Sequence, residues 1–391
     1  MKITDVRARL VRASERRSWV FIEIDTDEGI TGVGEATNSG GGGAIMVARA
    51  IEILRDDLPN SDFSEGLIGQ DPSHIERIWQ QIYRRFGALG SRGMPTAVLS
   101  GIDAALWDIK GKALGKPVYD LLGGPLRESI PLYTHVGHAD DPVAAAKHAR
   151  QLVDEGYVAL KTDPYSAEMS SQHRRYLSGQ ISAAGAEMGV NVMTAIREEV
   201  GPDVDLMIDA HGNFDVSTAI DMINRMAPIN LTWFEEPCQP ESLDALKQVR
   251  DYTDVPLCVG ERKYTRFDFL PILQERVVNY IMPDICWTGG ITETRKIATL
   301  AETFYIPISP HDASGPFNVI AGAHVMMNTP NIYRLEFGRA ALEGYNNCLA
   351  EPLDIRDGDL YLPDKPGLGY ELDIDFIEAH PDPDWIALGG S

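Results

Sequence analysis

The chain has 391 residues, 44% of them hydrophobic, and a formal net charge of −23 at pH 7. That length is too great for one ordinary hydrophobic core, so we expect two domains or a large barrel with an addition. The acidic balance argues against nucleic acid or an anionic membrane as a partner, because both favour basic surfaces.

The first residues and the cysteines indicate where the protein works. The opening stretch MKITDVRARLVRASERR alternates like a strand and lacks the long apolar run of a signal peptide. No apolar run in the chain reaches the roughly 18 residues that span a bilayer. The four cysteines lie far apart without a CxxC pair, which is typical of reduced, buried thiols. We therefore predict a cytoplasmic protein.

Residues 1–125 predict an α+β domain. The stretches MKITDVRARLVR and SWVFIEIDTDEGITGVGEA indicate a short antiparallel sheet, and the amphipathic patterns after them indicate helices. A glycine run, NSGGGGA, lies at residues 38–44. It lacks the GK[ST] sequence and the strand-to-helix context of a phosphate-binding loop, so we expect a mobile loop there instead.

From residue 131 onward, short apolar runs that end in polar or charged residues alternate with helical patterns. Alternation of this kind predicts βα units and a parallel sheet. Eight such runs suggest closure into a modified (β/α)8 barrel of the TIM type, which makes the chain an α/β protein. The runs are PLYTHV (131–136), YVALKTD (157–163), DLMIDAH (205–211), LTWFEEP (231–237), LCVGER (257–262), YIMPDI (280–285), IPISPHD (306–312) and YRLEFG (333–338).

We expect three segments along the chain. They are the α+β domain at residues 1–125, the barrel at 126–345, and a tail at 346–391 that returns to the first domain. One barrel connection is long, because 48 residues separate Lys161 from Asp209. Its extra residues, about 20, form either a tolerated surface insertion or a flap beside the mouth of the barrel.

Carboxylates end three successive strands of the expected barrel. Asp209, Glu235 and Glu261 follow one another at equal intervals of 26 residues. The C-terminal ends of barrel strands face one mouth, so these side chains converge, and three converging anions need a cation between them. An all-oxygen ligand set with open positions suits Mg²⁺, for which Mn²⁺ could substitute. Glu236 is then left to pair with a cation, for which we favour Arg262.

Taken together, the strand-end motifs resemble those of the enolase superfamily. They comprise LKTD, IDAHG, FEEP, GER, PDICWTGGITE, SPHDASG and LEFG, preceded by SGIDAALWDIKGKALGKPVYDLLGG. Within that superfamily the match is to the mandelate racemase-like sugar-acid dehydratases of the galactonate dehydratase type, over nearly the whole chain. The resemblance implies an α+β capping domain built from both termini and a homo-oligomer between dimer and octamer. It also implies a Lys or His base that acts with Mg²⁺.

The resemblance assigns roles to several strand-end residues. His311 is the base, and Asp284, at the end of the preceding strand, is its partner in a His–Asp dyad. Glu336 hydrogen-bonds the substrate carboxylate, and we expect it to be protonated because other anions lie close to it. Lys161 either orients the substrate or stabilises charge. A racemase of the family carries a KxK pair here, so Asp163 in place of the second lysine favours the dehydratases.

His211 bears most directly on the type of reaction. It follows Asp209 by two residues, and two such positions on a strand point the same way, so we expect its ring beside the metal site. Elimination of a β-hydroxyl needs an acid, because hydroxide leaves poorly unless it is protonated. The resemblance assigns that role to His211.

The assignments predict Mg²⁺-dependent dehydration of an aldonic acid, with loss of the C2 proton and the C3 hydroxyl, to give a 2-keto-3-deoxy sugar acid. One alternative is a racemase, epimerase or cycloisomerase that uses the same enolate, with Lys161 and His311 as two bases. A sugar-acid binding protein is a further alternative, less favoured because Lys161, His211, His311 and Glu336 are all present. We expect the glycine run and the long barrel connection to set substrate specificity.

Overall fold

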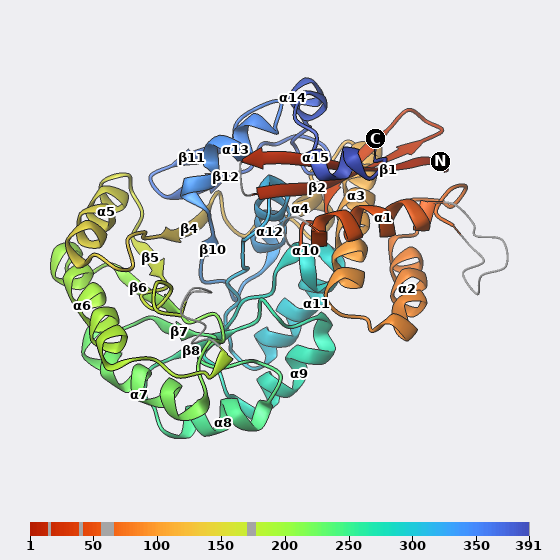
Figure 1. The fold of residues 1–391 in the computed structure, drawn as a ribbon. Coiled ribbons are helices and arrows are strands. Elements are labelled where there is room, and N and C mark those ends of the chain that lie inside the picture. The colour runs from red at the N-terminus through yellow and green to blue at the C-terminus, as the bar shows by residue number, and fades with distance from the viewer. Residues whose placement is uncertain (15–16, 39–41, 56–65, 170–176, 391) are drawn as a thin grey trace.

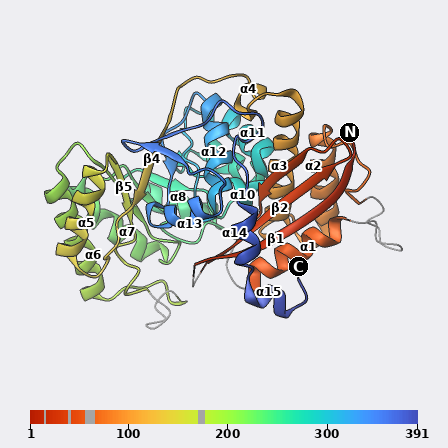
Figure 2. The ribbon, with the colours of Figure 1, turned by 90° about the horizontal axis from the view of Figure 1, so that it is seen from above.

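Two units lie side by side in the computed structural model, which describes residues 1–14, 17–38, 42–55, 66–169 and 177–390. A ring of strands and helices forms one unit, and a sheet with helices against it forms the other (Figure 1). Figure 2 shows the same arrangement from above, with the sheet and its helices beside the ring. Both chain termini lie at the second unit, which we call the capping domain.

The capping domain is built on an antiparallel sheet in the order β1–β2–β3. Alternate residues of β2 enter different cores, because successive side chains of a strand point to opposite faces. Val20, Ile22 and Ile24 pack with the helices of the capping domain, whereas Trp19 and Phe21 join the core shared with the barrel. The elements are β1 (Ile3–Ser14), β2 (Arg17–Thr26), β3 (Thr31–Glu35), α1 (Gly42–Arg55), α2 (Ile75–Arg85), η1 (Phe86–Leu89), α3 (Met94–Leu114) and α4 (Val118–Leu121).

Parallel strands pair in chain order from β4 to β9 in the described part of the barrel, and β10 pairs with β4. The expected strand at 306–312 forms only isolated bridges, from Ile308 to its neighbours on both sides and from His311 to Asp284. The prolines at 307 and 310 remove two N–H donors from this stretch, which explains the interruption. The strands are β4 (Ile130–His135), β5 (Ala159–Thr162), β6 (Asp205–Asp209), β7 (Trp233–Glu235), β8 (Leu257–Val259), β9 (Tyr280–Ile281) and β10 (Leu335–Glu336).

Helices surround the strands (Figure 1). Several of them begin at a side-chain cap, since Asp141, Ser182, Asp215 and Ser242 accept hydrogen bonds from the first backbone N–H groups of the helix that follows each. These helices and their neighbours are α5 (Pro142–Asp154), α6 (Ala183–Val200), α7 (Val216–Met226), η3 (Ala227–Ile229), α8 (Leu243–Asp251), α9 (Thr265–Glu275), α10 (Ile285–Thr288), α11 (Gly290–Thr303) and α12 (Pro316–Asn328).

The barrel interior changes from apolar to charged along the strands. Its apolar cluster includes Tyr133, Ala159, Met207, Trp233 and Met282. Because side chains two positions apart share a face, the next inward residues on these strands are His135, Lys161, Asp209, Glu235 and Asp284. On β8 the charged residue, Glu261, comes three positions after Cys258, and Gly260 between them has a φ of 156°. A Cβ at Gly260 would lie 2.6 Å from Met282 N, so this register shift requires glycine.

The C-terminal segment contacts both units. β12 pairs antiparallel with β4, and the backbone N–H of Asp382 donates to Leu10 of β1 at 2.9 Å. Trp385 is buried in the capping-domain core. Across the described residues, no helix combines the length and apolar character needed to cross a membrane. The remaining elements are η4 (Arg339–Ala341), α13 (Leu342–Asn347), β11 (Asp354–Arg356), β12 (Asp359–Tyr361), α14 (Ile374–Ala379) and α15 (Pro383–Ala387).

Candidate active site and metal centre

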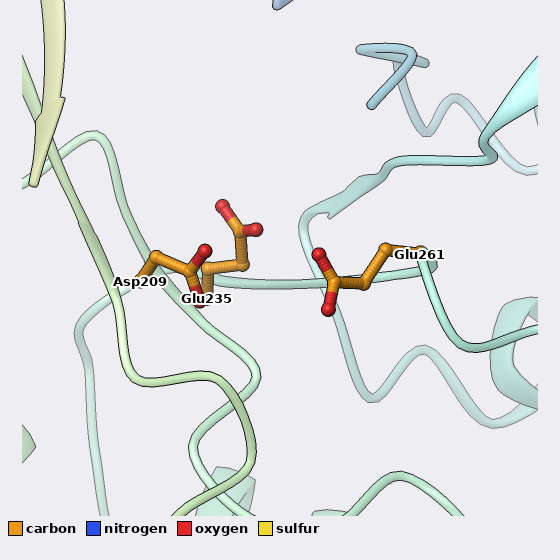
Figure 3. A group of neighbouring side chains, drawn as sticks. All are labelled: Asp209, Glu235 and Glu261. Atoms are coloured by element: carbon orange, nitrogen blue, oxygen red, sulfur yellow. The ribbon is translucent and has the colours of Figure 1, made fainter. Parts of the chain in front are cut away.

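Three carboxylates meet at the C-terminal ends of neighbouring strands. Asp209 ends β6, Glu235 ends β7, and Glu261 follows β8. Figure 3 shows the three side chains directed toward one another across a common space. One oxygen of each lies within 4.8 Å of an oxygen of the other two, and all three residues are buried. This is the convergence expected from their equal spacing.

The ammonium group of Lys161 lies among these acids. Its Nζ is 2.9 Å from Glu235 Oε1, 2.7 Å from Glu336 Oε1 and 3.5 Å from Asp209 Oδ2. Burial alone would lower the pKa of Lys161, but the attraction of Glu235 and Glu336 outweighs burial and raises the pKa well above its usual range. Lys161 is therefore a fixed cation next to the triad.

The donor set fits a hard divalent cation. Burial, followed by repulsion from Asp209, raises the pKa of Glu235 well above its usual range. Arg262 and two histidines also contact these acids, but the three triad carboxylates still converge on one space, and a cation between them would reduce their mutual repulsion. Carboxylate oxygens are the ligands that Mg²⁺ prefers, and the three could hold such an ion while leaving positions for water or substrate.

Glu336, at the end of β10, contacts an ammonium group and an imidazole, whereas we expected it to be protonated. Its Oε1 lies 2.6 Å from His135 Nε2 and 2.7 Å from Lys161 Nζ. Burial favours the neutral acid, but Lys161, His311 and His135 outweigh burial and hold the pKa of Glu336 well below its usual range. The expectation of a protonated acid is therefore wrong, because it considered only the neighbouring anions. We did not predict His135 as a site residue, although it lies near the end of the first apolar run, PLYTHV. That run forms β4, which pairs with β10.

His311 contacts one acid on each ring nitrogen. Its Nδ1 lies 2.7 Å from Asp284 Oδ2, and its Nε2 lies 2.8 Å from Glu261 Oε2. A carboxylate at Nδ1 holds the proton on that nitrogen and leaves Nε2 to exchange a proton at the triad. Burial lowers the pKa of His311, but Glu261 and Glu336 outweigh it and raise the pKa well above its usual range.

His211 forms a second His–Asp pair. Its Nδ1 lies 2.8 Å from Asp163 Oδ2, and its Nε2 lies 3.3 Å from Asp209 Oδ2. Burial lowers the pKa of His211, but Asp209 and Asp163 raise it to about 9. We expected strand alternation to place this ring beside Asp209. However, β6 ends at Asp209, and His211 lies in a turn with a φ of 51°, so the turn rather than the strand places the ring there. Sequence reasoning left the role of Asp163 open, and the pair supplies its partner.

Glu236 pairs with Arg262, the partner that we favoured from the sequence. The chain turns sharply after Glu235, since Glu236 has a φ of 40°. Its carboxylate contacts the guanidinium of Arg262, which also lies 2.9 Å from Glu261 Oε1. Arg262 therefore links Glu236 to Glu261, the last member of the triad.

A cavity of about 690 Å³ opens onto these side chains. The capping domain contributes Ala13, Arg17 and Trp19 from the β1–β2 hairpin, and the segment 338–347 after β10 forms another part of the wall. Asp163 of the long connection lines the cavity, whereas the described residues of the glycine run and of the extra stretch after Asp163 do not. Their part in substrate specificity stays a prediction. Residues 39–41 and 170–176 of those two stretches lie outside the described residues.

Comparisons with known proteins agree over almost the whole chain. A model of the mandelate racemase/muconate lactonizing enzyme N-terminal domain matches residues 5–123, and a model described as enolase C-terminal domain-like matches residues 144–376. A member of the enolase superfamily from Salmonella Typhimurium, of known structure, superimposes with a TM-score of 0.87 at 34% identity, over 97% of this chain and 98% of its own.

Curated relatives carry the names of sugar-acid enzymes. D-xylonate dehydratase from Haloferax volcanii is 33% identical over 97% of this chain and 89% of its own. D-galactonate dehydratase from Pectobacterium atrosepticum is 34% identical over 94% of this chain and 92% of its own. D-galactarolactone cycloisomerase from Agrobacterium fabrum is 34% identical over 98% of this chain and its full length. The relatives therefore include proteins named for each of the two predicted reactions, dehydration and cycloisomerisation.

Proposed function

The chain belongs to the mandelate racemase/muconate lactonizing enzyme group of the enolase superfamily, and on that premise we propose that it is a hydro-lyase that dehydrates a sugar acid. The substrate would be an aldonic acid that loses its C2 proton and its C3 hydroxyl. The product would be a 2-keto-3-deoxy sugar acid. The cavity suits such a substrate, because its volume of about 690 Å³ holds a small polyhydroxy acid and its charged lining can bind hydroxyl groups.

One observation carries the proposal: a His–Asp pair stands at each end of the acid triad. His211 reaches Asp209, the first member, and His311 reaches Glu261, the last. Elimination requires a base for the C2 proton and an acid for the departing hydroxyl, and this arrangement supplies two imidazoles for the two tasks. Proton transfer at a single carbon would need no imidazole beside Asp209.

Asp209, Glu235 and Glu261 would hold Mg²⁺, or Mn²⁺ in its place. When bound, the ion would supply positive charge that stabilises the second negative charge developing on the substrate carboxylate. Lys161 and Glu336 flank the same position, so Lys161 would add a fixed positive charge there. Because Lys161 already contacts three carboxylates, we assign it to charge stabilisation rather than to base catalysis.

The chain's own residues would move the protons in sequence. The charges of Glu261 and Glu336 raise the pKa of His311, so His311 acts as a base once those charges are balanced. Its Nε2 then takes the C2 proton, with Asp284 holding the imidazole from the other side, and the C2–H electron pair enters the carboxylate as an enediolate. The enediolate then expels the C3 hydroxyl, and His211 protonates this group as it leaves as water. The enol that remains becomes the 2-keto acid by gaining a proton at C3 and losing the proton of its C2 hydroxyl. Asp163 orients His211 throughout.

A cycloisomerase is the second candidate, because the Agrobacterium fabrum relative with that name matches this chain over its full length. It would use His311 and the same carboxylate site, but without loss of water. A two-base racemase is less favoured, because Lys161 is 2% exposed and surrounded by acids.

A screen of aldonic acids, aldaric acids and their lactones with Mg²⁺ tests the proposal, with 2-keto acid formation as the readout. We expect a dehydration product from at least one aldonic acid. His211→Asn should still exchange the C2 proton with deuterated solvent while forming little product, and His311→Asn should do neither. If the native protein only exchanges C2 hydrogen or opens lactones, the dehydratase assignment is wrong.

A further inference from the structure

The carboxylate of Glu35, at the end of β3, lies against the start of α12. One oxygen accepts the backbone N–H of Gly315 at 2.5 Å and the Thr37 hydroxyl at 2.6 Å. The other accepts the N–H groups of Phe317 at 3.0 Å and Asn318 at 3.2 Å. The side chain is 1% exposed. A carboxylate of the capping domain therefore caps a barrel helix that follows it by 280 residues.

The sequence next to α12 provides no side-chain cap of its own, and Glu35 takes that role. The residue before the helix, Gly315, has no side chain that could serve as a cap. A Cβ there would lie 2.7 Å from Glu35 Oε1 and 2.9 Å from the ring of Trp19, so a larger residue would force one of these capping-domain side chains to move. The cap is thus built jointly by the two units.

The same first turn of α12 holds the His–Asp dyad through Asn318. Its amide nitrogen lies 3.1 Å from the backbone oxygen of His311, 3.1 Å from Asp312 Oδ1 and 3.3 Å from Asp284 Oδ2. Its amide oxygen accepts the N–H of Cys286 at 3.1 Å. One side chain therefore joins the chain segments that carry His311 and Asp284.

A second contact from the capping domain reaches the same loops. The carbonyl oxygen of Thr37 accepts the Ser314 hydroxyl at 2.9 Å and the indole N–H of Trp287 at 2.7 Å. The Trp287 ring lies 5.0 Å from the imidazole of His311, centroid to centroid. Residues 35 and 37 thus fix both loops from outside the barrel.

We propose that Glu35 is a positioning residue: through the first turn of α12 and Asn318, it sets the relative placement of His311 and Asp284. Its kinetic consequence rests on the proposed function, because His311 is the base only there. The geometric consequence, a fixed contact between His311 Nδ1 and Asp284, stands without it. The capping domain is then part of the apparatus that aligns the base, in addition to its contribution to the cavity wall.

Asp103 provides a matched control. It too is a capping-domain carboxylate, 1% exposed, and it accepts the N–H of Thr292 in the first turn of the neighbouring barrel helix, α11, at 2.9 Å. The hydroxyl of Thr292 accepts the indole N–H of Trp107, so this turn is tied back to the capping domain rather than to the dyad. Loss of Asp103 removes a similar cap without touching Asn318.

The experiment compares Glu35→Gln with Asp103→Asn, using the aldonic acid that the native protein turns over fastest in the screen, with Mg²⁺. For Glu35→Gln we expect kcat to fall about tenfold to a hundredfold, as a misplaced catalytic group does, with KM changed less than about twofold. C2 hydrogen exchange should fall in parallel. Asp103→Asn should keep kcat within about twofold at temperatures where it is folded. Equal kcat in the two variants would overturn the proposal.

A substrate-free readout separates this proposal from the proposed function. The proton on His311 Nδ1 should give a downfield NMR signal, assigned by its absence from His311→Asn, because a carboxylate accepts from it. We expect Glu35→Gln to shift or broaden the signal and Asp103→Asn to leave it unchanged. If Glu35→Gln does not fold, Thr37→Val, which removes one donor to Glu35, should show the same changes to a smaller degree. An unchanged signal in the folded Glu35 or Thr37 variant would refute positioning, whether or not the native protein dehydrates sugar acids.

Discussion

Buried carboxylates gather in two regions of this molecule, the barrel mouth and the junction where β3 and α3 meet the barrel helices. At the mouth, Asp209, Glu235 and Glu261 face one another with oxygens within 4.8 Å. At the junction, Glu35 and Asp103 each accept backbone N–H groups from the start of a barrel helix. The junction acids bond mainly to backbone N–H groups of the fold, although Asp103 Oδ1 has no hydrogen-bond partner among the described residues. The mouth acids instead face one another, with Lys161, Arg262 and two histidines beside them. The contrast separates acids that stabilise the fold from acids arranged to bind an external cation.

The histidines of the two regions differ in the same way. At the mouth, neighbouring acids raise the pKa of His211 to about 9 in spite of burial. At the junction, burial lowers the pKa of His324 to about 4, and its ring nitrogens contact only backbone groups, Tyr119 N at 3.2 Å and Leu368 O at 3.0 Å. The His211 side chain is 46% exposed and His324 is fully buried, so the neighbouring acids and the weaker burial at the mouth both contribute to the difference.

The largest effect should follow from removing one mouth acid. Glu235→Gln takes away a proposed metal ligand and should lower activity by about a thousandfold or more. Native protein should gain about 2.7 kcal/mol of unfolding free energy at Mg²⁺ concentrations a hundred times the Kd, and the variant should gain little. Calorimetric titration with Mg²⁺ and thermal unfolding measure both. Unchanged Mg²⁺ binding in the variant would contradict the three-carboxylate site.

The opposite pattern should follow from removing a junction acid. Asp108 of α3 accepts the N–H groups of Val33 and Leu368 at 2.9 and 2.7 Å and pairs with Lys112 at 2.9 Å. Asp108→Asn should lower the unfolding free energy by about 3–5 kcal/mol, as the loss of one partner of a buried ion pair does. Denaturant unfolding measures the loss. At temperatures where the variant is folded, kcat and Mg²⁺ affinity should match the native values, and a selective loss of either would erase the distinction between the regions.

The mouth was largely predictable from the sequence because it follows a simple rule. An apolar run that ends in a charged residue predicts a buried strand with a side chain at the barrel mouth, and equal spacing aligned Asp209, Glu235 and Glu261. Two contacts of site residues were not predicted in this way. The contact of His135 with Glu336 depends on β4 and β10 being neighbours, which closure of the predicted barrel implies but which we did not apply to His135. The pairing of Asp163 with His211 depends on a turn with positive φ after β6.

The junction could not have been predicted in this way. Asp103 and Asp108 lie within an amphipathic helical pattern, where acids ordinarily occupy the solvent face. Their burial results from a helix covered on both sides, by the sheet of its own domain and by barrel elements such as α11. The backbone partners of Asp103 and Glu35 lie 189 and 280 residues away, so no local pattern carries the information. The broken strand at 306–312 is the reverse case, because its prolines were visible and received too little weight.

The histidine comparison predicts a specific dependence of stability on pH. His324 binds a proton near pH 6.5 when unfolded but only near pH 4 when folded. The unfolded state therefore binds more protons between these values, so this contribution is present above pH 6.5 and is lost as the pH falls toward 4. The loss should amount to about 3 kcal/mol.

The contribution of His324 is measured as the difference in unfolding free energy between the native protein and a variant without the imidazole. Denaturant unfolding of native protein and of His324→Gln between pH 7 and pH 4.5 isolates the term, because contributions from the other titrating groups are shared. We expect the native free energy of unfolding to fall more steeply toward acid than that of the variant. Parallel curves would mean that His324 has the same pKa in the folded and unfolded states, and the predicted effect of its burial would then be wrong.

The smallest effect concerns Asp163, an acid of the mouth whose partner lies within the protein, as at the junction. Its carboxylate accepts from His211 Nδ1, which leaves Nε2 as the nitrogen that can protonate a departing hydroxyl. In Asp163→Asn the amide can turn its NH₂ group toward Nδ1 and thereby favour the wrong tautomer, so dehydration should slow about tenfold to a hundredfold. C2 hydrogen exchange, which depends on His311, should persist at close to the native rate, and Mg²⁺ affinity should be retained because Asp163 is not a proposed ligand.

Comparison of product formation with deuterium exchange in the same sample separates the two steps. A parallel fall in both would mean that Asp163 acts on the whole mouth through its charge, and the second His–Asp pair would then have no separate role in elimination.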